Sequence, residues 1–218
     1  MPVCAHGIPV SVPPHNLIGF SDARKPKFWL SLPEENKPFI KLIHTMLSQK
    51  LLEALNAQVN AEFWSAYLYL SMSVDAAAKG YKGVANWFAV QFREEQDHAQ
   101  ILMNYILSRG AEVRLAPIAE VRTSWGSPLE MFRDTLEHER EVTAMINNLC
   151  RIAADDRDFA SSNMLVWFVD EQVEEEESAK DQIDALEQVE DNKLGIYMID
   201  KELAARTYAQ AAPLAGKA

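Results

Sequence analysis

Residues 93–98 contain two glutamates and a histidine, Glu94, Glu95 and His98, within a stretch of apolar helical periodicity. Glu95 and His98 are three residues apart, so they share one face of a helix. Phe88 and Leu102 lie seven residues before and after Glu95, which predicts that this face is buried. A buried ionised carboxylate without a partner is strongly unfavourable, so the sequence must supply a compensating positive charge.

Three other helical stretches each place one glutamate on their apolar face, namely Glu62, Glu139 and Glu175. One such residue per helix, each near the middle, indicates a common site rather than independent accidents. The four carboxylates and a neutral His98 carry a charge that two divalent cations balance. Carboxylate oxygens with one imidazole and no thiolate suit iron(II), manganese(II) or zinc(II). We expect Glu95 between the two metal ions, with Glu62 and His98 on one and Glu139 and Glu175 on the other.

The segments that must position these residues are predicted to be helices, because apolar residues recur at helical spacing and only eight of 218 residues are glycine. We expect four long helices at about 49–79, 84–109, 128–154 and 159–189, and a short fifth helix at about 196–208. Ser48 is a good N-cap for the first of these helices. Residues 111–127 are long enough to cross the length of a bundle. This order predicts an all-α four-helix bundle with a long crossover between the second and third helices.

The chain divides by composition into three parts. Residues 1–45 hold seven of the ten prolines and are net basic, so we expect a loosely ordered N-terminal extension. Residues 46–208 form the helical domain, and residues 209–218 a C-terminal tail. Met46, followed by Ser48, resembles the natural beginning of a helical domain. Residues 1–45 are therefore an additional arm, an unremoved targeting segment or the result of a start codon assigned too early, and the sequence leaves these alternatives open.

Charge and hydropathy exclude several functions. A formal net charge of −11 argues against a nucleic-acid partner and agrees with cation handling or an acidic solvated surface. No apolar run reaches the length of about 20 residues that crosses a membrane, and the prolines interrupt any secretory signal. Two cysteines are too few for a disulfide framework. A cytoplasmic protein is the simplest expectation.

A second acidic group accompanies the first. Glu94, Glu171 and Glu174 are neighbours in sequence of the inward residues and could form a further cation site. Residues 174–177 are four consecutive glutamates, however, and such runs are usually solvated faces. Both interpretations stay open on the pattern alone.

Residues 46–208 resemble the bacterial-type non-haem ferritins, within the ferritin-like di-iron family. The resemblance rests on the motifs NAE at 60–62 with Tyr69, EEQDHA at 94–99, EHE at 137–139 and WFVDEQVEEE at 167–176. It implies a ferroxidase centre at Glu62, Glu95, His98, Glu139 and Glu175, with Gln172 as a hydrogen-bonding neighbour and Tyr69 as a redox-active tyrosine. It also implies a third iron site from Glu94, Glu171 and Glu174, and a homo-oligomeric, hollow 24-subunit shell that stores ferric mineral.

The expected function is therefore iron storage with ferroxidase activity. Two iron(II) ions held side by side would give two electrons to dioxygen, or react with hydrogen peroxide, and pass ferric iron to the cavity. Bacterioferritin is similar but holds haem through a methionine where this chain has Gln96, so we expect no haem. A rubrerythrin-like peroxidase lacks support because there is no cysteine-rich segment. A di-metal oxidase of organic substrates and a metal-free helical scaffold stay open as alternatives.

Overall fold

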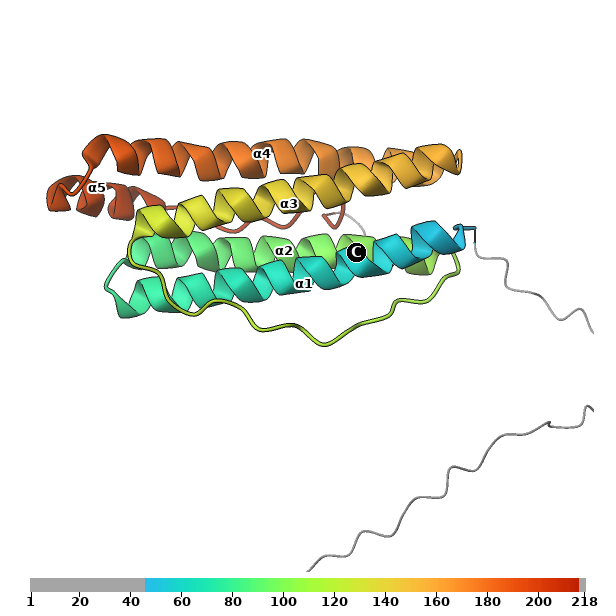
Figure 1. Ribbon diagram of the computed structural model, residues 1–218, viewed down its shortest axis with the longest axis horizontal. Coiled ribbons are helices and arrows are strands. Elements are labelled where there is room, and N and C mark those ends of the chain that lie inside the picture. Colours follow the sequence, from blue (N-terminus) through green and yellow to red (C-terminus); the bar gives the residue numbers. More distant parts are fainter. Residues whose placement is uncertain (1–45, 216–218) are drawn as a thin grey trace, which may run out of the picture. The chain divides into compact units, whose positions relative to one another are not determined.

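The computed structural model describes residues 46–215, so the expectation for residues 1–45 lies outside the described part of the chain. Its helices are α1 (Gln49–Ala78), α2 (Lys82–Ser108), α3 (Pro128–Asp155), α4 (Phe159–Val189) and α5 (Lys193–Leu203). The first four lie side by side as a bundle, and α5 continues from the end of α4 (Figure 1). There is no strand in the part described. The predicted all-α bundle with a crossover and a short fifth helix is confirmed.

Polar side chains start most of the helices. Ser48 accepts a hydrogen bond from the Leu51 amide, as its N-cap position predicts, and Ser127 does the same for Glu130 at the start of α3. These bonds satisfy amides that have no partner within the helix. The sequence therefore encodes the starts of α1 and α3 locally.

Two apolar clusters fill the bundle, and the buried glutamates lie between them. On α1, Glu62 lies between Val59 of the first cluster and Leu68 of the second. Each fully buried aliphatic side chain in these clusters contributes about 1.5–3 kcal/mol. On each of the other long helices the buried glutamate also lies between residues of the two clusters, with Glu95 on α2, Glu139 on α3 and Glu175 on α4. The apolar packing above and below therefore holds four carboxylates at one level of the bundle.

The crossover, residues 111–127, runs along α1 and is fixed there by two asparagines (Figure 1). Asn56 donates to the carbonyl of Glu112 and accepts from the amide of Arg114, at 3.1 and 2.6 Å. One turn later, Asn60 donates to the Arg114 carbonyl and accepts from the Ala116 amide, at 2.9 and 2.6 Å. Two side chains of α1 thus supply hydrogen-bond partners to backbone groups of a segment that forms no regular secondary structure.

The start of α2 is buried against α5. Gly83, which we expected in the preceding turn, lies inside α2, and a Cβ on it would lie 1.5 Å from the backbone oxygen of Asp200. The Asp200 carboxylate accepts hydrogen bonds from the amides of Gly83 and Val84 at 2.8 and 2.9 Å. It replaces the side-chain cap that Tyr81 does not provide. Glycine at position 83 is therefore required by close approach of the backbones.

Helix α5 begins and ends earlier than the predicted range 196–208. Asn192 accepts hydrogen bonds from the amides of Leu194 and Gly195, so Gly195 lies inside the helix rather than before it. After Leu203 the chain leaves the helix, because Arg206 and Tyr208 bind side chains of α2. The prediction that α5 continues to Tyr208 is wrong for this reason.

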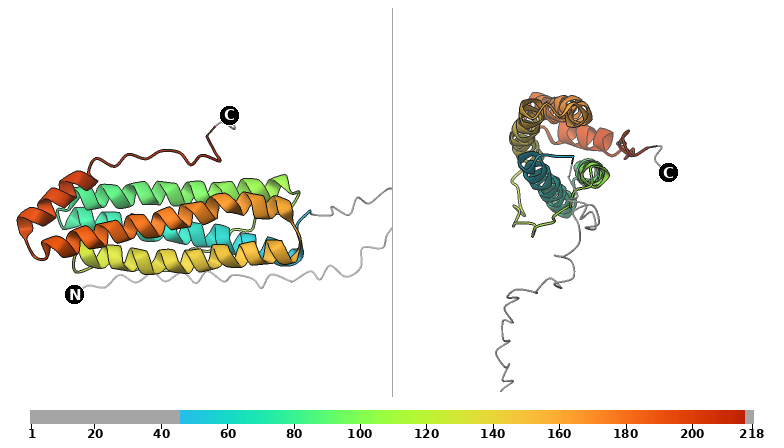
Figure 2. Two further views of the ribbon diagram at one scale, coloured as in Figure 1. Left: turned by 90° about the horizontal axis from the view of Figure 1, so that it is seen from above. Right: turned by 90° about the vertical axis from the view of Figure 1, so that its right-hand side faces the viewer.

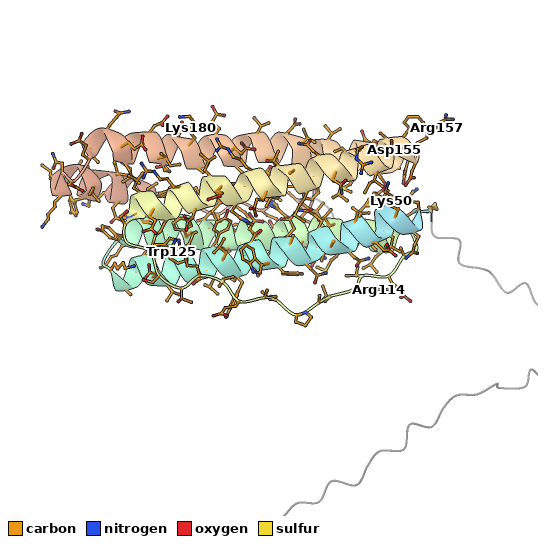
Figure 3. All side chains as sticks on the ribbon, viewed as in Figure 1. Lys50, Arg114, Trp125, Asp155, Arg157 and Lys180 are labelled. Carbon is orange, nitrogen blue, oxygen red and sulfur yellow. The ribbon has the colours of Figure 1, made fainter. Side chains whose placement is uncertain are left out.

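Charged side chains cover the outside of the bundle. Figure 3 shows Lys50, Arg114, Asp155, Arg157 and Lys180 extending outward, and all five are exposed. Within the described residues, none of the helices has the length and apolar character needed to cross a bilayer.

Candidate metal centre

Five polar side chains meet in the middle of the bundle, and we call them the carboxylate centre: Glu62, Glu95, His98, Glu139 and Glu175. Each is at most 6% exposed. They come from all four long helices, with Glu95 and His98 one turn apart on α2. The structure therefore brings all five residues to the interior, at the level between the two apolar clusters.

Four of these residues have ligand atoms that fall into two candidate metal groups, whereas Glu139 belongs to neither group. One oxygen each of Glu62 and Glu95 and one nitrogen of His98 lie within 4.8 Å of one another. A second group consists of His98, Glu171 and Glu175, with the same limit on distance. The His98 Nδ1 atom is 3.4 Å from Glu95, and its Nε2 atom is 3.7 Å from Glu171. His98 thus lies between the two groups.

Neutral hydrogen-bond donors orient the carboxylates. Gln58 donates to Glu62 at 2.9 Å, and Gln91 donates to Glu175 at 2.8 Å. Glu139 accepts from Gln172 at 3.3 Å and from the hydroxyl of Tyr69. These bonds fix the direction of the carboxylates without cancelling their charge.

Two buried oxygens lack a hydrogen-bond partner among the described residues: Oε2 of Glu62 and Oε1 of Gln91. A buried acceptor without a partner costs about 1–3 kcal/mol. Within residues 46–215, moreover, no lysine or arginine forms an ion pair with Glu62, Glu139 or Glu175. Unpartnered carboxylate oxygen is the donor that iron(II), manganese(II) and zinc(II) accept, so these residues fit a divalent cation.

Electrostatics confirm that the centre is short of positive charge. Burial, together with the neighbouring carboxylates, raises the pKa of Glu139 to about 7 and that of Glu175 to about 8. Burial also raises the pKa of Glu95 well above its ordinary value. Burial alone would lower the pKa of His98, but the carboxylates of Glu95 and Glu171 outweigh it and hold this pKa well above normal. A single imidazolium cannot balance four carboxylates, so the metal-free centre retains protons.

Aromatic rings enclose the centre on two sides. Tyr69 is fully buried against Phe88, with ring centroids 5.9 Å apart, and burial raises the pKa of its hydroxyl well above the ordinary value. Trp167 lies edge-on to His98 at 5.4 Å. Tyr69 therefore remains protonated and donates to Glu139 from the interior.

The predicted third group is less converged, and we call Glu94, Glu171 and Glu174 the α2–α4 flank. Glu171 is half-buried and close to His98. Glu94 instead forms an ion pair with Arg206 at 2.7 Å, and Glu174 is exposed. The structure thus places one of these three residues in a candidate metal group and leaves the other two outside it.

Three supporting residues were not identified from the sequence. Gln58 lies one turn before Glu62 and Gln91 one turn before Glu95, so each was a polar residue on a buried stripe that helical periodicity could have revealed. The Thr143 hydroxyl lies 2.6 Å from Glu176 and 3.2 Å from the side-chain oxygen of Gln172, and its one hydrogen can point to either acceptor. The position of Thr143 against α4 depends on the packing of α3, which gives no local signal.

Comparisons with known proteins agree with this geometry. Residues 52–189 match the Ferritin family, described as a ferritin-like domain. The chain is 42% identical over 163 residues to a bacterial non-heme ferritin of Staphylococcus aureus (strain USA300), covering 75% of this chain and 98% of that protein. It is also 42% identical over 161 residues to a bacterial non-heme ferritin of Bacteroides fragilis (strain 638R), covering 74% and 100%. Among solved structures, a novel open pore ferritin from the hyperthermophilic archaeon Archaeoglobus fulgidus is similar with a TM-score of 0.73 and 43% identity, covering 74% and 99%.

Proposed function

Because this chain belongs to the ferritin family and is thereby an iron storage protein, we propose that it is also a ferroxidase that oxidises iron(II) and stores the product as ferric mineral. The observation that carries this proposal is the carboxylate centre, where four glutamates from four helices are buried in the bundle interior with His98 and have no lysine or arginine partner in the described residues. Bound cations would balance this buried negative charge, which in the metal-free protein is reduced only by retained protons. Iron(II) is the substrate here rather than a permanent cofactor.

The residues have distinct roles in this proposal. Glu95 lies between two iron(II) ions, Glu62 and His98 bind one, and Glu139 and Glu175 bind the other. Two adjacent iron(II) ions can give two electrons to one molecule of dioxygen or hydrogen peroxide, which a single ion cannot. Gln172 and Tyr69 support this step, because both hydrogen-bond to Glu139. In this proposal Tyr69 also supplies a further electron, as the resemblance to bacterial ferritins implies.

Storage requires a container and a route out of the centre. We propose that copies of this chain assemble into a 24-subunit hollow shell, as the resemblance to bacterial ferritins implies. Glu94, Glu171 and Glu174 then form a third iron position next to the centre. Light scattering on the purified protein tests the assembly, since a monomer in solution would contradict it.

Dioxygen consumption after addition of iron(II) under controlled conditions tests the catalytic proposal. We expect uptake of about one dioxygen for two iron(II) at low loading. Glu95→Ala should slow it by roughly 100-fold or more, since even outer partners of metal ligands are worth about 10–100-fold. Glu177→Ala, an exposed residue of the glutamate run on α4, is the matched control and should keep the normal rate. Oxidation no faster than in buffer would show that the proposed activity is wrong.

A further inference from the structure

The segment after α5, residues 204–211, lies along α2, and we call it the C-terminal strap. Figure 2 shows it beside α2 on the side of the bundle away from α3. Asn86 of α2 donates to the carbonyls of Leu203 and Arg206, at 3.2 and 2.9 Å. Further along, Asp97 accepts from the Tyr208 hydroxyl and the Ala211 amide, both at 2.8 Å. The strap is thus attached to α2 at both ends.

Between these attachments, the strap presents one cation to the α2–α4 flank. The Arg206 guanidinium forms a 2.7 Å ion pair with Glu94 and lies 4.6 Å from the centroid of the Trp87 ring. It also donates to the backbone oxygen of Trp87 at 3.3 Å. Both charged side chains are only about a quarter exposed or less, at 26% and 21%. Three kinds of contact therefore fix the guanidinium, as the fork of an arginine allows and a lysine would not.

This ion pair explains why the flank is only partly converged. Glu171 and Glu174 both repel the charge of Glu94, while Arg206 attracts it. Glu171 has its ligand atom close to His98 and Glu175, but Glu94 is directed to Arg206 and belongs to no candidate metal group in the described chain. Glu94 nevertheless precedes Glu95 directly in sequence. Glu94 is thus next to a residue of the centre along the chain, but its carboxylate is engaged by the arginine.

We propose that Arg206 is an exchangeable counter-ion for Glu94, which an iron ion must displace to occupy the third position. The inference rests on the proposed ferroxidase function and adds the element that controls the third site. Arg206 is a positioning residue, because it acts through Glu94 and contacts no reacting atom. In this arrangement the strap neutralises the charge of Glu94 until the two irons of the centre are bound and a third arrives.

Competition for one carboxylate must act in both directions. If the docked strap weakens binding of the third cation, the bound cation loosens the strap by the same factor. Coupling of this kind is worth about 5–150-fold in affinity. The attachment of the strap to α2 is therefore expected to weaken as the flank binds a cation.

Zinc titration of the assembled full-length protein by calorimetry tests the inference, since Zn²⁺ binds similar ligands without being oxidised. Arg206→Gln should tighten the third Zn²⁺ per subunit by about tenfold, within the range of such couplings, and leave the first two unchanged. Arg206→Lys keeps the charge and should lie closer to the wild type. Arg133→Gln is the control, because Arg133 pairs with Glu187 on the exposed α3–α4 surface and its loss changes the net charge equally.

A double variant separates the specific contact from a general charge effect. In a Glu94→Gln background, Arg206→Gln should no longer change zinc affinity, because the shared carboxylate is gone. Hydrogen exchange of residues 204–211 in the wild type should become faster on saturation with Zn²⁺. The inference is overturned if Arg206→Gln leaves the third affinity within about twofold of the wild type, or if its effect persists without Glu94. Failure of the wild type to oxidise iron would overturn the proposed function instead, and the zinc titration would still judge Arg206.

Discussion

Glu94 and Glu95 are adjacent in the sequence, yet the fold gives them opposite partners. Glu95 is 2% exposed, lies next to His98 and has no lysine or arginine among the described residues. Glu94 lies at the side of the same helix and receives the guanidinium of Arg206. The interior carboxylate is left for a cation from solution, while the outer one already has a cation of the protein.

The difference shows how one helix can provide two binding strengths. In the carboxylate centre, neutral amides hold the ligands in place and leave their charge unbalanced. On the α2–α4 flank, a charged partner must first be removed. A cation is therefore expected to bind the centre first and the flank second.

Removing one ligand from each region gives the largest contrast. Glu139→Ala should lower the initial rate of iron oxidation by roughly 100-fold or more, because it removes a proposed iron ligand and the acceptor of Tyr69 and Gln172. Glu94→Ala should lower the rate by less than about tenfold, because Glu94 is not part of the pair of sites where the electrons leave iron. Absorbance of ferric products in stopped flow measures both rates. Equal losses in the two variants would remove the distinction between centre and flank.

The orienting amides should have a smaller effect. Gln91→Ala removes the donor to Glu175, and we expect about 10-fold weaker binding of the second zinc ion, as for other partners of metal ligands. Gln100→Ala is the matched control, because Gln100 is an exposed amide of the same helix that bonds only to Asn104. Calorimetric titration measures both variants. An unchanged second affinity in Gln91→Ala would show that the amide serves packing alone.

The smallest expected effect is on stability against pH. Glu139 and Glu175 have pKa values of about 7 and about 8 in the folded, metal-free protein, above the ordinary value of 4.5. Raised carboxyl pKa values stabilise the fold when the groups are protonated, so this contribution is lost as the pH rises through the folded values. We expect the Tm of the metal-free protein to fall by about 5 °C or more between pH 6 and 8.5.

Zinc provides the control for this pH dependence. Bound Zn²⁺ should displace the protons and remove most of the fall in Tm, with release of protons on binding. Calorimetric scans with and without zinc, together with a pH-stat, measure the two effects. A metal-free protein that is more stable at pH 8.5 than at pH 6 would contradict the charge shortage that distinguishes the centre from the flank.

The sequence predicted the parts of this molecule that depend on local periodicity. The four long helices and the inward direction of Glu62, Glu95, Glu139 and Glu175 follow from apolar spacing, because a carboxylate on a buried stripe is visible in the sequence. Ser48 likewise marks a helix start through a bond to an amide three residues away. Such features need no knowledge of how the helices pack.

The parts that the sequence did not predict depend on contacts between distant segments. Arg206 meets Glu94 across 112 positions, and Asp200 caps α2 across 117. Neither pairing could be read from helical periodicity in the sequence, because each depends on how a distant segment packs against α2. The predicted end of α5 was wrong for the same reason, because hydrogen bonds to α2 draw the chain out of the helix after Leu203.

Gly83 is a position where any larger side chain disrupts the contact between α2 and α5. Since a single methyl group would overlap the backbone of Asp200, the contact between α2 and α5 cannot be adjusted gradually by substitution at this position. Replacement would displace α5 and, with it, the arginine that follows, about three turns along α2 from the altered codon. A substitution at this packing position would thus alter the proposed third cation site through Arg206. Relatives with a larger residue at this position are expected to attach their C-terminal segments elsewhere.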